Sequence, residues 1–230
     1  MSKRTVHPVA LYHGEKNVSG ERVAEALMRL RIPFEMITAG EIAAGKLGAH
    51  PAVIFPGGHS IGLSKQGVVE VKRFVEAGGG FLGICAGCQF AVRIKLLNVR
   101  IRFLRASGIF DMRVAKSHPV TRGYGRARSW KKGERWKYLK AGRVRMRYCN
   151  GGMLKALKGA DALVCFDESD EFASVVAGTR GIGRVVLVTS HPESTPPASQ
   201  SGAFASDADT SPEPLRLFAN AVRWAARLPL

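Results

Sequence analysis

The chain lacks the features that would place it in a membrane or in the secretory pathway. No stretch of its 230 residues approaches the roughly 20 consecutive apolar residues that a membrane span needs. The segment from Met1 to Pro8 has no apolar core of a signal peptide. The 4 cysteines are too few for a disulfide-rich scaffold. These absences predict a cytoplasmic protein with reduced thiols and no membrane contact.

Acidic residues are scarce in one part of the chain. Residues 93–150 contain 18 lysines and arginines but only 2 acidic residues, so this basic segment carries nearly all of the net charge of +17. Its centre interleaves the basic residues with Trp130, Trp136 and Tyr138, a pattern that can hold phosphates and stack bases. No RNA- or DNA-binding motif is present, so we favour a solvated excursion or a contact with an acidic protein over nucleic acid.

Patterns typical of metal sites are also missing. No two histidines have the helical or short-loop spacing of a motif such as H-E-x-x-H. His13 and His59 follow expected strands and would face the same edge of a sheet, but they form no such pair. We therefore expect neither a metal nor another cofactor.

The most informative stretch that is present covers residues 80–89. A short apolar run ends at Cys85, and a segment compatible with a helix, from Ala86 to Ile94, begins at once. Gly83 and Gly87 lie two residues to either side of the cysteine, as in a nucleophile elbow, where glycines let backbones pass closely. A thiol at a helix N-terminus is favoured as the thiolate. The peptide N–H of Ala86 would point to a forming oxyanion.

Two other interpretations of Cys85 remain open at this point. Free cysteines are often small buried hydrophobes. Cys85 and Cys88 also have the C-x-x-C spacing of redox motifs at a helix start.

Two further segments supply partners for a nucleophilic thiol. The apolar run 52–55 breaks into a Pro-Gly-Gly turn, where the N–H groups of Gly57 and Gly58 emerge at a strand end. The run 185–190 leads directly into His191, with Glu193 two residues later. The imidazole can serve as the base, and the carboxylate can orient it. His59 is the alternative base.

Apolar segments alternate between short strand-like runs and longer amphipathic runs. We expect strands at 5–13, 33–38, 52–55 and 81–84, with helices at 19–30, 41–46 and 64–77 between them. Further strands at 161–166, 172–177 and 184–189, partly antiparallel, precede a helix at 211–227. This α/β order predicts a mostly parallel sheet with helices on both faces, built as a single domain over residues 1–230. Ligands bind such sheets at the strand C-terminal ends, where Gly58, Cys85 and His191 fall.

At these residues the chain resembles the class I glutamine amidotransferase-like superfamily. Gly83, Cys85, Gly87 and Gln89 match its G-x-C-x-G-x-Q motif, His191 and Glu193 match its His-x-Glu ending, and Gly57 and Gly58 match its oxyanion loop. Residues 147–152 (Arg-Tyr-Cys-Asn-Gly-Gly) are similar to a segment of proteins related to the N-terminal domain of biotin-protein ligase.

The resemblance implies a flavodoxin-like fold and hydrolysis of a carboxamide through a thioester by the triad Cys85, His191 and Glu193. It places the oxyanion at Gly58 and Ala86, and the substrate, a small glutamine-like amide, beside Gly57, Gln89, Asn150 and Gly151. An ammonia-accepting synthase or an acidic protein would be the partner. The alternative is a non-catalytic regulatory or binding module on the same fold, with the basic segment binding a polyanion.

Overall fold

The computed structural model describes residues 7–14, 20–58, 61–125, 142–166, 171–196 and 212–230. In these residues the strands are β1 (Val9–Tyr12), β2 (Phe34–Ile37), β3 (Ala52–Phe55), β4 (Gly80–Ile84), β5 (Val99–Phe103), β6 (Ser107–Val114), β7 (Arg143–Cys149), β8 (Gly152–Ala156), β9 (Ala160–Cys165), β10 (Ala173–Arg180) and β11 (Gly183–Val188). The helices are α1 (Gly20–Arg29), α2 (Ala39–Ala43), α3 (Lys65–Glu76), α4 (Ala86–Arg93) and α5 (Pro212–Ala225), with 3-10 turns η1 (Lys46–Ala49), η2 (Pro119–Thr121) and η3 (Pro192–Ser194). From β1 to α4, strands and helices alternate as the sequence predicted.

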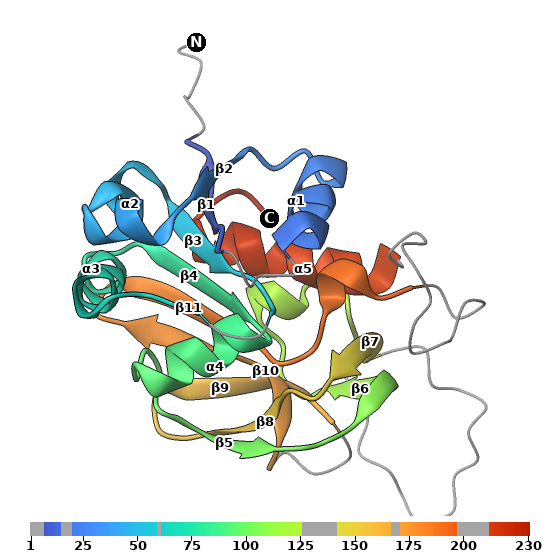
Figure 1. Ribbon diagram of the computed structural model, residues 1–230. Coiled ribbons are helices and arrows are strands. Elements are labelled where there is room, and N and C mark those ends of the chain that lie inside the picture. The colour runs from blue at the N-terminus through green and yellow to red at the C-terminus, as the bar shows by residue number, and fades with distance from the viewer. Residues whose placement is uncertain (1–6, 15–19, 59–60, 126–141, 167–170, 197–211) are drawn as a thin grey trace, which may run out of the picture.

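The described strands form one mixed sheet in the order β2-β1-β3-β4-β11-β10-β9-β6-β7, with β8 pairing β10 and β5 pairing β8 (Figure 1). Strands β2, β1, β3, β4 and β11 pair in parallel. From β11 onward the pairs with β10, β9, β6 and β7 are antiparallel. The expectation of a mostly parallel sheet therefore holds for one half only, because the strands between residues 99 and 156 were not anticipated.

The described part of the basic segment belongs to this sheet and is not an excursion from it. In β7, Val144, Met146 and Tyr148 are buried, whereas the arginines between them are exposed or half-buried. This alternation with a period of two is typical of an antiparallel strand with one face against the core. Residues 126–141, with Trp130, Trp136 and Tyr138, lie outside the described residues.

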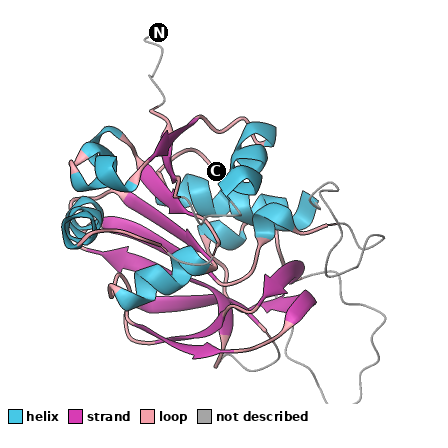
Figure 2. Cartoon of the chain, in the orientation of Figure 1, coloured by secondary structure: helices cyan, strands magenta, loops and turns pink. Residues whose placement is uncertain are grey.

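Helices cover both faces of the sheet, as expected (Figure 2). Alternate strand residues point to opposite faces: Leu11 and Leu82 pack in a core cluster with α1 and α5, whereas Val53 and Phe81 pack in a second cluster with α2, α3 and α4. Strands β3, β4 and β11 lie at the centre between these layers. Because the three strands are parallel, their C-terminal ends meet at one edge of the sheet.

Candidate active site

The turn between β4 and α4 holds Cys85 in a strained conformation. Its backbone has φ 48° and ψ −106°, in the region of positive φ that a residue with a side chain rarely adopts. The peptide N–H of Cys85 donates to the Val188 carbonyl of β11 at 2.8 Å, and the Cys85 carbonyl accepts from the Gln89 N–H at 3.0 Å. The cysteine is thus fixed between a central strand and the first turn of a helix.

The glycines on either side of Cys85 are required by close backbone contacts. A Cβ atom added at Gly83 would lie 2.6 Å from the Gly87 carbonyl oxygen. A Cβ atom at Gly87 would lie 2.0 Å from the carbonyl oxygen of Phe55 in β3. The predicted close approach of backbones at this spacing is confirmed, because no side chain fits at either position.

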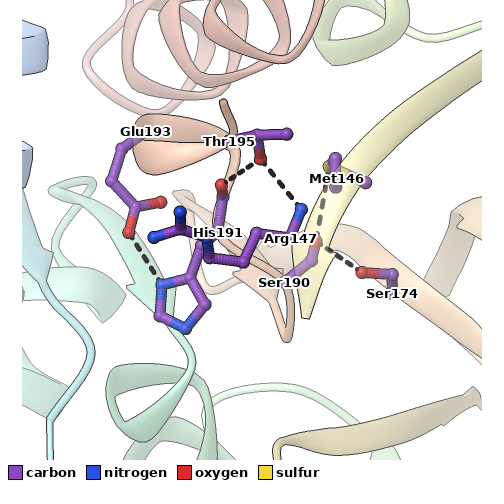
Figure 3. A network of polar contacts seen from close by, with 7 residues as sticks. All are labelled: Met146, Arg147, Ser174, Ser190, His191, Glu193 and Thr195. Atoms are coloured by element: carbon purple, nitrogen blue, oxygen red, sulfur yellow. Dashed lines mark hydrogen bonds and ion pairs between the residues drawn. The ribbon is translucent and has the colours of Figure 1, made fainter. Parts of the chain in front are cut away.

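His191 and Glu193 follow β11 and form a buried pair. Strand β11 pairs with β4 in parallel, with Val188 opposite Ile84, so its end lies beside Cys85. The Nδ1–H of His191 donates to Oε1 of Glu193 at 2.8 Å, and the side chains of His191 and Glu193 are only 9% and 0% exposed (Figure 3). The His191 side chain is also hydrogen-bonded to Cys85. The structure therefore brings Cys85, His191 and Glu193 together.

The surroundings of His191 favour its protonated form. Burial alone would lower the pKa of this imidazole, but the Glu193 carboxylate and the hydrogen bonds to Cys85 and Glu193 outweigh it and raise the pKa above its ordinary value. The result is a buried, protonated imidazole that lies between the Glu193 carboxylate and the Cys85 sulfur.

A set of contacts from the basic segment fixes the backbone around His191. The His191 N–H donates to the Arg147 carbonyl at 2.7 Å. The Thr195 hydroxyl accepts from the Arg147 N–H at 2.9 Å and donates to the His191 carbonyl at 2.5 Å (Figure 3). In the same view the side chain of Arg147 points toward Glu193. Sequence reasoning gave Arg147 no role of its own within the 147–152 tract, because it acts here through backbone groups, and it did not identify Thr195, which acts through its hydroxyl.

A second set of contacts supports the end of β11. The buried Ser174 hydroxyl donates to the Ser190 hydroxyl at 2.7 Å, and Ser190 donates to the Met146 sulfur at 3.3 Å. A satisfied buried network of this kind restricts the local backbone to one arrangement. Ser190 directly precedes His191, so the network holds the histidine in register.

Tyr148 joins the 147–152 tract to the site. Its buried hydroxyl lies 2.5 Å from the Gly151 carbonyl and 3.1 Å from the Leu104 carbonyl. The pKa of Tyr148 is raised to about 12, mainly by burial and to a smaller extent by the nearby sulfurs of Cys85 and Cys149. The tract that the sequence singled out therefore borders Cys85, with Tyr148 as its inward residue.

The remaining residues predicted for the site lie around the same edge of the sheet. Phe55, the last residue of β3, is opposite Gly83 of β4, so the buried Gly57 and the half-buried Gly58 follow at the same edge of the sheet as Cys85. Ala86 is the first residue of α4, where the peptide N–H has no partner four residues earlier. Gln89 is half-buried, one turn further along α4.

Asn150 and Gly151 form the turn between β7 and β8. Asn150 is exposed and has φ 46°, and its N–H donates to the Ala106 carbonyl. Gly151 is buried, and an added Cβ would meet the Thr189 carbonyl oxygen at 2.7 Å. Gly151 thus packs against the strand end that leads to His191, while the Asn150 side chain is turned to solvent.

The structure gives no support to the redox interpretation. Cys88 lies fully buried in the cluster beneath α3 and α4, whereas Cys85 packs against the cluster on the opposite face of the sheet. The pKa of the Cys88 thiol is raised, mainly by burial and to a smaller extent by the charge of Cys85. Both cysteines are free.

Two other histidines were considered for roles at the site. His59 lies outside the described residues, and His13 is exposed at the end of β1. Within the described ranges, no three histidine, cysteine or acidic side chains are grouped so that they could hold a metal. None of the described helices is long and apolar enough to cross a membrane.

Comparisons with known proteins agree with this geometry at the level of the fold. Residues 47–101 match the family model of the biotin-protein ligase N-terminal domain, a range that includes Gly57, Gly58, Cys85 and Gln89. No curated protein matches the chain.

Three solved structures illustrate the likeness. A protein from Thermoplasma acidophilum, named for its proposed role in GMP synthase, has a TM-score of 0.66 and 13% identity, with 97% of this chain and 96% of that chain covered. PurLQS from Thermotoga maritima has a TM-score of 0.65 and 17% identity, with 95% and 99% covered. A glutamine amidotransferase from Thermotoga maritima has a TM-score of 0.55 and 14% identity, with 81% and 76% covered. The chain therefore has the fold of the class I glutamine amidotransferase-like proteins and is similar, over residues 47–101, to the N-terminal domain of biotin-protein ligase.

Proposed function

We propose that this protein is a cysteine amidase that hydrolyses a carboxamide through a thioester. One observation carries the proposal: the buried imidazole of His191 contacts both the Cys85 side chain and the Glu193 carboxylate. Nucleophile, base and orienting carboxylate in contact are the arrangement that activates a thiol for acyl transfer. The strained turn at Cys85, flanked by Gly83 and Gly87, is then a nucleophile elbow.

The proposed reaction begins with a thiolate at Cys85. The N-terminus of α4 and the imidazolium of His191 both favour negative charge on this sulfur. The sulfur attacks the carboxamide carbon, and the N–H groups of Gly58 and Ala86 bind the resulting oxyanion. Because Nδ1 of His191 donates to Glu193, Nε2 is the nitrogen that serves Cys85 and the substrate.

His191 then transfers protons in both halves of the reaction. Its imidazolium protonates the leaving nitrogen as the C–N bond breaks, which releases ammonia or an amine and leaves a thioester on Cys85. The neutral imidazole next takes a proton from water, which attacks the thioester carbon. Collapse releases the carboxylic acid and restores the thiolate and imidazolium.

The substrate class proposed here is a small amide of the glutamine type, held beside Gly57, Gln89 and the 150–151 turn. One similar structure is named as part of a GMP synthase. We therefore propose a separate synthase as the acceptor when ammonia is transferred rather than released.

Ammonia release from a panel of primary amides, with glutamine included, tests this function. We expect Cys85→Ser and His191→Ala to abolish turnover without loss of fold, and Cys149→Ser to leave it unchanged, since Cys149 is exposed on β7. A glutamine-like diazo-ketone should label Cys85 and neither Cys149 nor Cys165.

Two results would contradict the proposal. Wild-type turnover in His191→Ala would exclude His191 as the base and make His59 the residue to test. If no amide is hydrolysed and Cys85 is alkylated no faster than Cys149, the fold serves as a binding module instead.

A further inference from the structure

Strand β5 is an edge of the described sheet, because it pairs with β8 and with no other described strand (Figure 1). Just before β5 begins, the Asn98 carbonyl accepts from the N–H of Leu157, which follows β8, at 3.1 Å. Successive residues of an antiparallel strand direct their backbone groups to opposite sides, so Asn98 sets the alternation. The N–H and C=O groups of Ile101 and Phe103 therefore point away from β8, and no described backbone group pairs with them.

The two faces of β5 differ in their chemistry. Arg100 and Arg102 are exposed on one face, and Arg100 lies opposite Lys155 of β8. Ile101 and Phe103 lie on the other face, where they line a cavity of about 320 Å³ that α4 also borders. A strand added at this edge would therefore meet arginines on one of its faces and apolar side chains on the other.

The apolar face of β5 is incompletely covered. Phe103 is 65% exposed, although its side chain is large and aromatic. The cavity that it lines with Phe90 and Val92 does not include Cys85 in its walls. Phe90 belongs to the core cluster on one face of the sheet, whereas Cys85 packs against the cluster on the other face. This surface is therefore separate from the proposed active site, and aromatic residues with arginines beside them are typical of protein interfaces.

The charge around β5 has one sign. Residues 93–110 contain five lysines and arginines and no acidic residue. Among the described residues, Arg100 and Arg102 have no acidic partner, since Glu171 pairs with Lys155 at 3.1 Å. The guanidinium carbon of Arg102 lies 5.7 Å from the centre of the Phe172 ring. A partner with complementary charge at this edge is acidic.

These features distinguish between three kinds of occupant. A second copy of the chain, paired through β5, would bring arginines close to arginines and join two molecules that each carry a net charge of +17. A nucleic acid would satisfy the arginines, but it has no row of N–H and C=O groups to pair with the free edge. An extended acidic peptide satisfies both the charges and the backbone groups.

We propose that β5 binds an extended acidic segment of a partner protein as an added strand. In this arrangement every second side chain of the segment is acidic and lies beside Arg100 and Arg102. The side chains between them are apolar, cover Ile101 and Phe103, and reach the cavity next to α4. Main-chain hydrogen bonds at the edge supply affinity, and the alternating side chains supply specificity. The proposal does not depend on amidase activity.

A capped peptide of about eight residues that alternates glutamate with valine is the probe, since strands commonly have this length. We expect it to bind the full-length protein at low ionic strength, measured by fluorescence anisotropy. Hydrogen exchange should show the amides of Ile101 and Phe103 slowed by at least about tenfold in the complex, because they gain partners. The same peptide with every second amide N-methylated, on the edge that pairs, should not bind.

Substitutions on the two faces of β5 test the side-chain contacts. Phe103→Ala should weaken peptide binding by about tenfold, as expected for an aromatic anchor. Arg100→Gln combined with Arg102→Gln should weaken it roughly three- to tenfold and reduce its dependence on salt. Ile182→Ala and Arg145→Gln are the matched controls, because Ile182 is 68% exposed and Arg145 is exposed on β7, both outside β5. Neither control should change binding.

Several results would overturn the proposal. Absence of peptide binding, equal binding of the N-methylated peptide, or binding without protection of the two amides would exclude strand addition. Equal effects of Phe103→Ala and Ile182→Ala would exclude the apolar contact. Tighter binding of a single-stranded RNA of the same charge, weakened by the same substitutions, would assign the surface to nucleic acid. A dimer in sedimentation that Phe103→Ala dissociates would assign it to a second copy.

Discussion

Replacing Glu193 with glutamine isolates the charge of the proposed triad. The substitution keeps the size of the side chain, and the glutamine carbonyl can still accept the Nδ1–H of His191, which now lies 2.8 Å from the carboxylate. What is lost is the negative charge that raises the pKa of the imidazole. We therefore expect the pKa of His191 to fall, turnover to be partial, and the fold to persist.

The size of the effect follows from the burial of the pair. A hydrogen bond to a charged group contributes about 1.5–3 kcal/mol, and a difference of one in pKa corresponds to about 1.36 kcal/mol. The pKa of His191 should therefore fall by roughly 1–2. In the wild-type protein the raised pKa adds stability that is fully present below the unfolded value of about 6.5 and is lost as the pH rises through the folded value. This dependence should flatten in Glu193→Gln.

Two measurements check the reasoning. An NMR titration of the His191 ring reports the pKa directly, and urea unfolding between about pH 5 and pH 11, which brackets the unfolded pKa of about 6.5 and the folded pKa of about 10, reports the linked stability. Glu171→Gln is the matched control, since Glu171 pairs with Lys155 on the surface at 3.1 Å with side chains about half-exposed. If the pKa of His191 moves by less than half a unit, or if both variants show the same pH profile, Glu193 does not set the charge of the imidazole.

Two further predictions concern the turn at Cys85. Gly87→Ala should destabilise the protein by about 1–3 kcal/mol, because the new methyl group meets the Phe55 carbonyl rather than a movable side chain. Gly48→Ala is the control and should not destabilise it, since an added Cβ there has no atom within 4 Å. Urea unfolding of both variants distinguishes them, and equal unfolding midpoints would contradict the close contact at Gly87. In the native protein, thiol reagents should modify Cys85 and the exposed Cys149, whereas the buried Cys88 and Cys165 should react only after unfolding. A Cys85–Cys88 disulfide found by mass spectrometry after mild oxidation would contradict the placement of these two residues on opposite faces of the sheet.

The parts of the site that the sequence predicted are those fixed by local geometry. The spacing of Gly83, Cys85 and Gly87 follows from steric contacts within one turn and one neighbouring strand, so residue type alone reveals it. His191 and Glu193 are two residues apart at a strand end, and their hydrogen bond needs no distant segment. Such features leave a mark in the sequence, because only certain side chains satisfy them.

The strands of the basic segment were not predicted, because charge hid their periodicity. In β7, arginines alternate with Val144, Met146 and Tyr148, and in β5 they alternate with Val99, Ile101 and Phe103. A high density of arginine is typical of a solvent-exposed face, so the alternation of arginines with apolar residues was not interpreted as a strand. In β7 the apolar half of the repeat is buried, and in β5 Val99 and Ile101 pack against the core, so the apolar residues decided the structure.

The contacts that hold His191 from β7 could not have been predicted from either segment. They consist of the carbonyl and N–H of Arg147 together with the Thr195 hydroxyl. Backbone groups are the same at every position, so a long-range pairing that uses them leaves no mark on residue type. Only the antiparallel register, in which β7 runs beside β6 at the end of the sheet, brings Arg147 to His191. The basic segment therefore forms part of the wall of the candidate site, and a change in its strand pairing would displace the imidazole without altering any residue of the proposed triad.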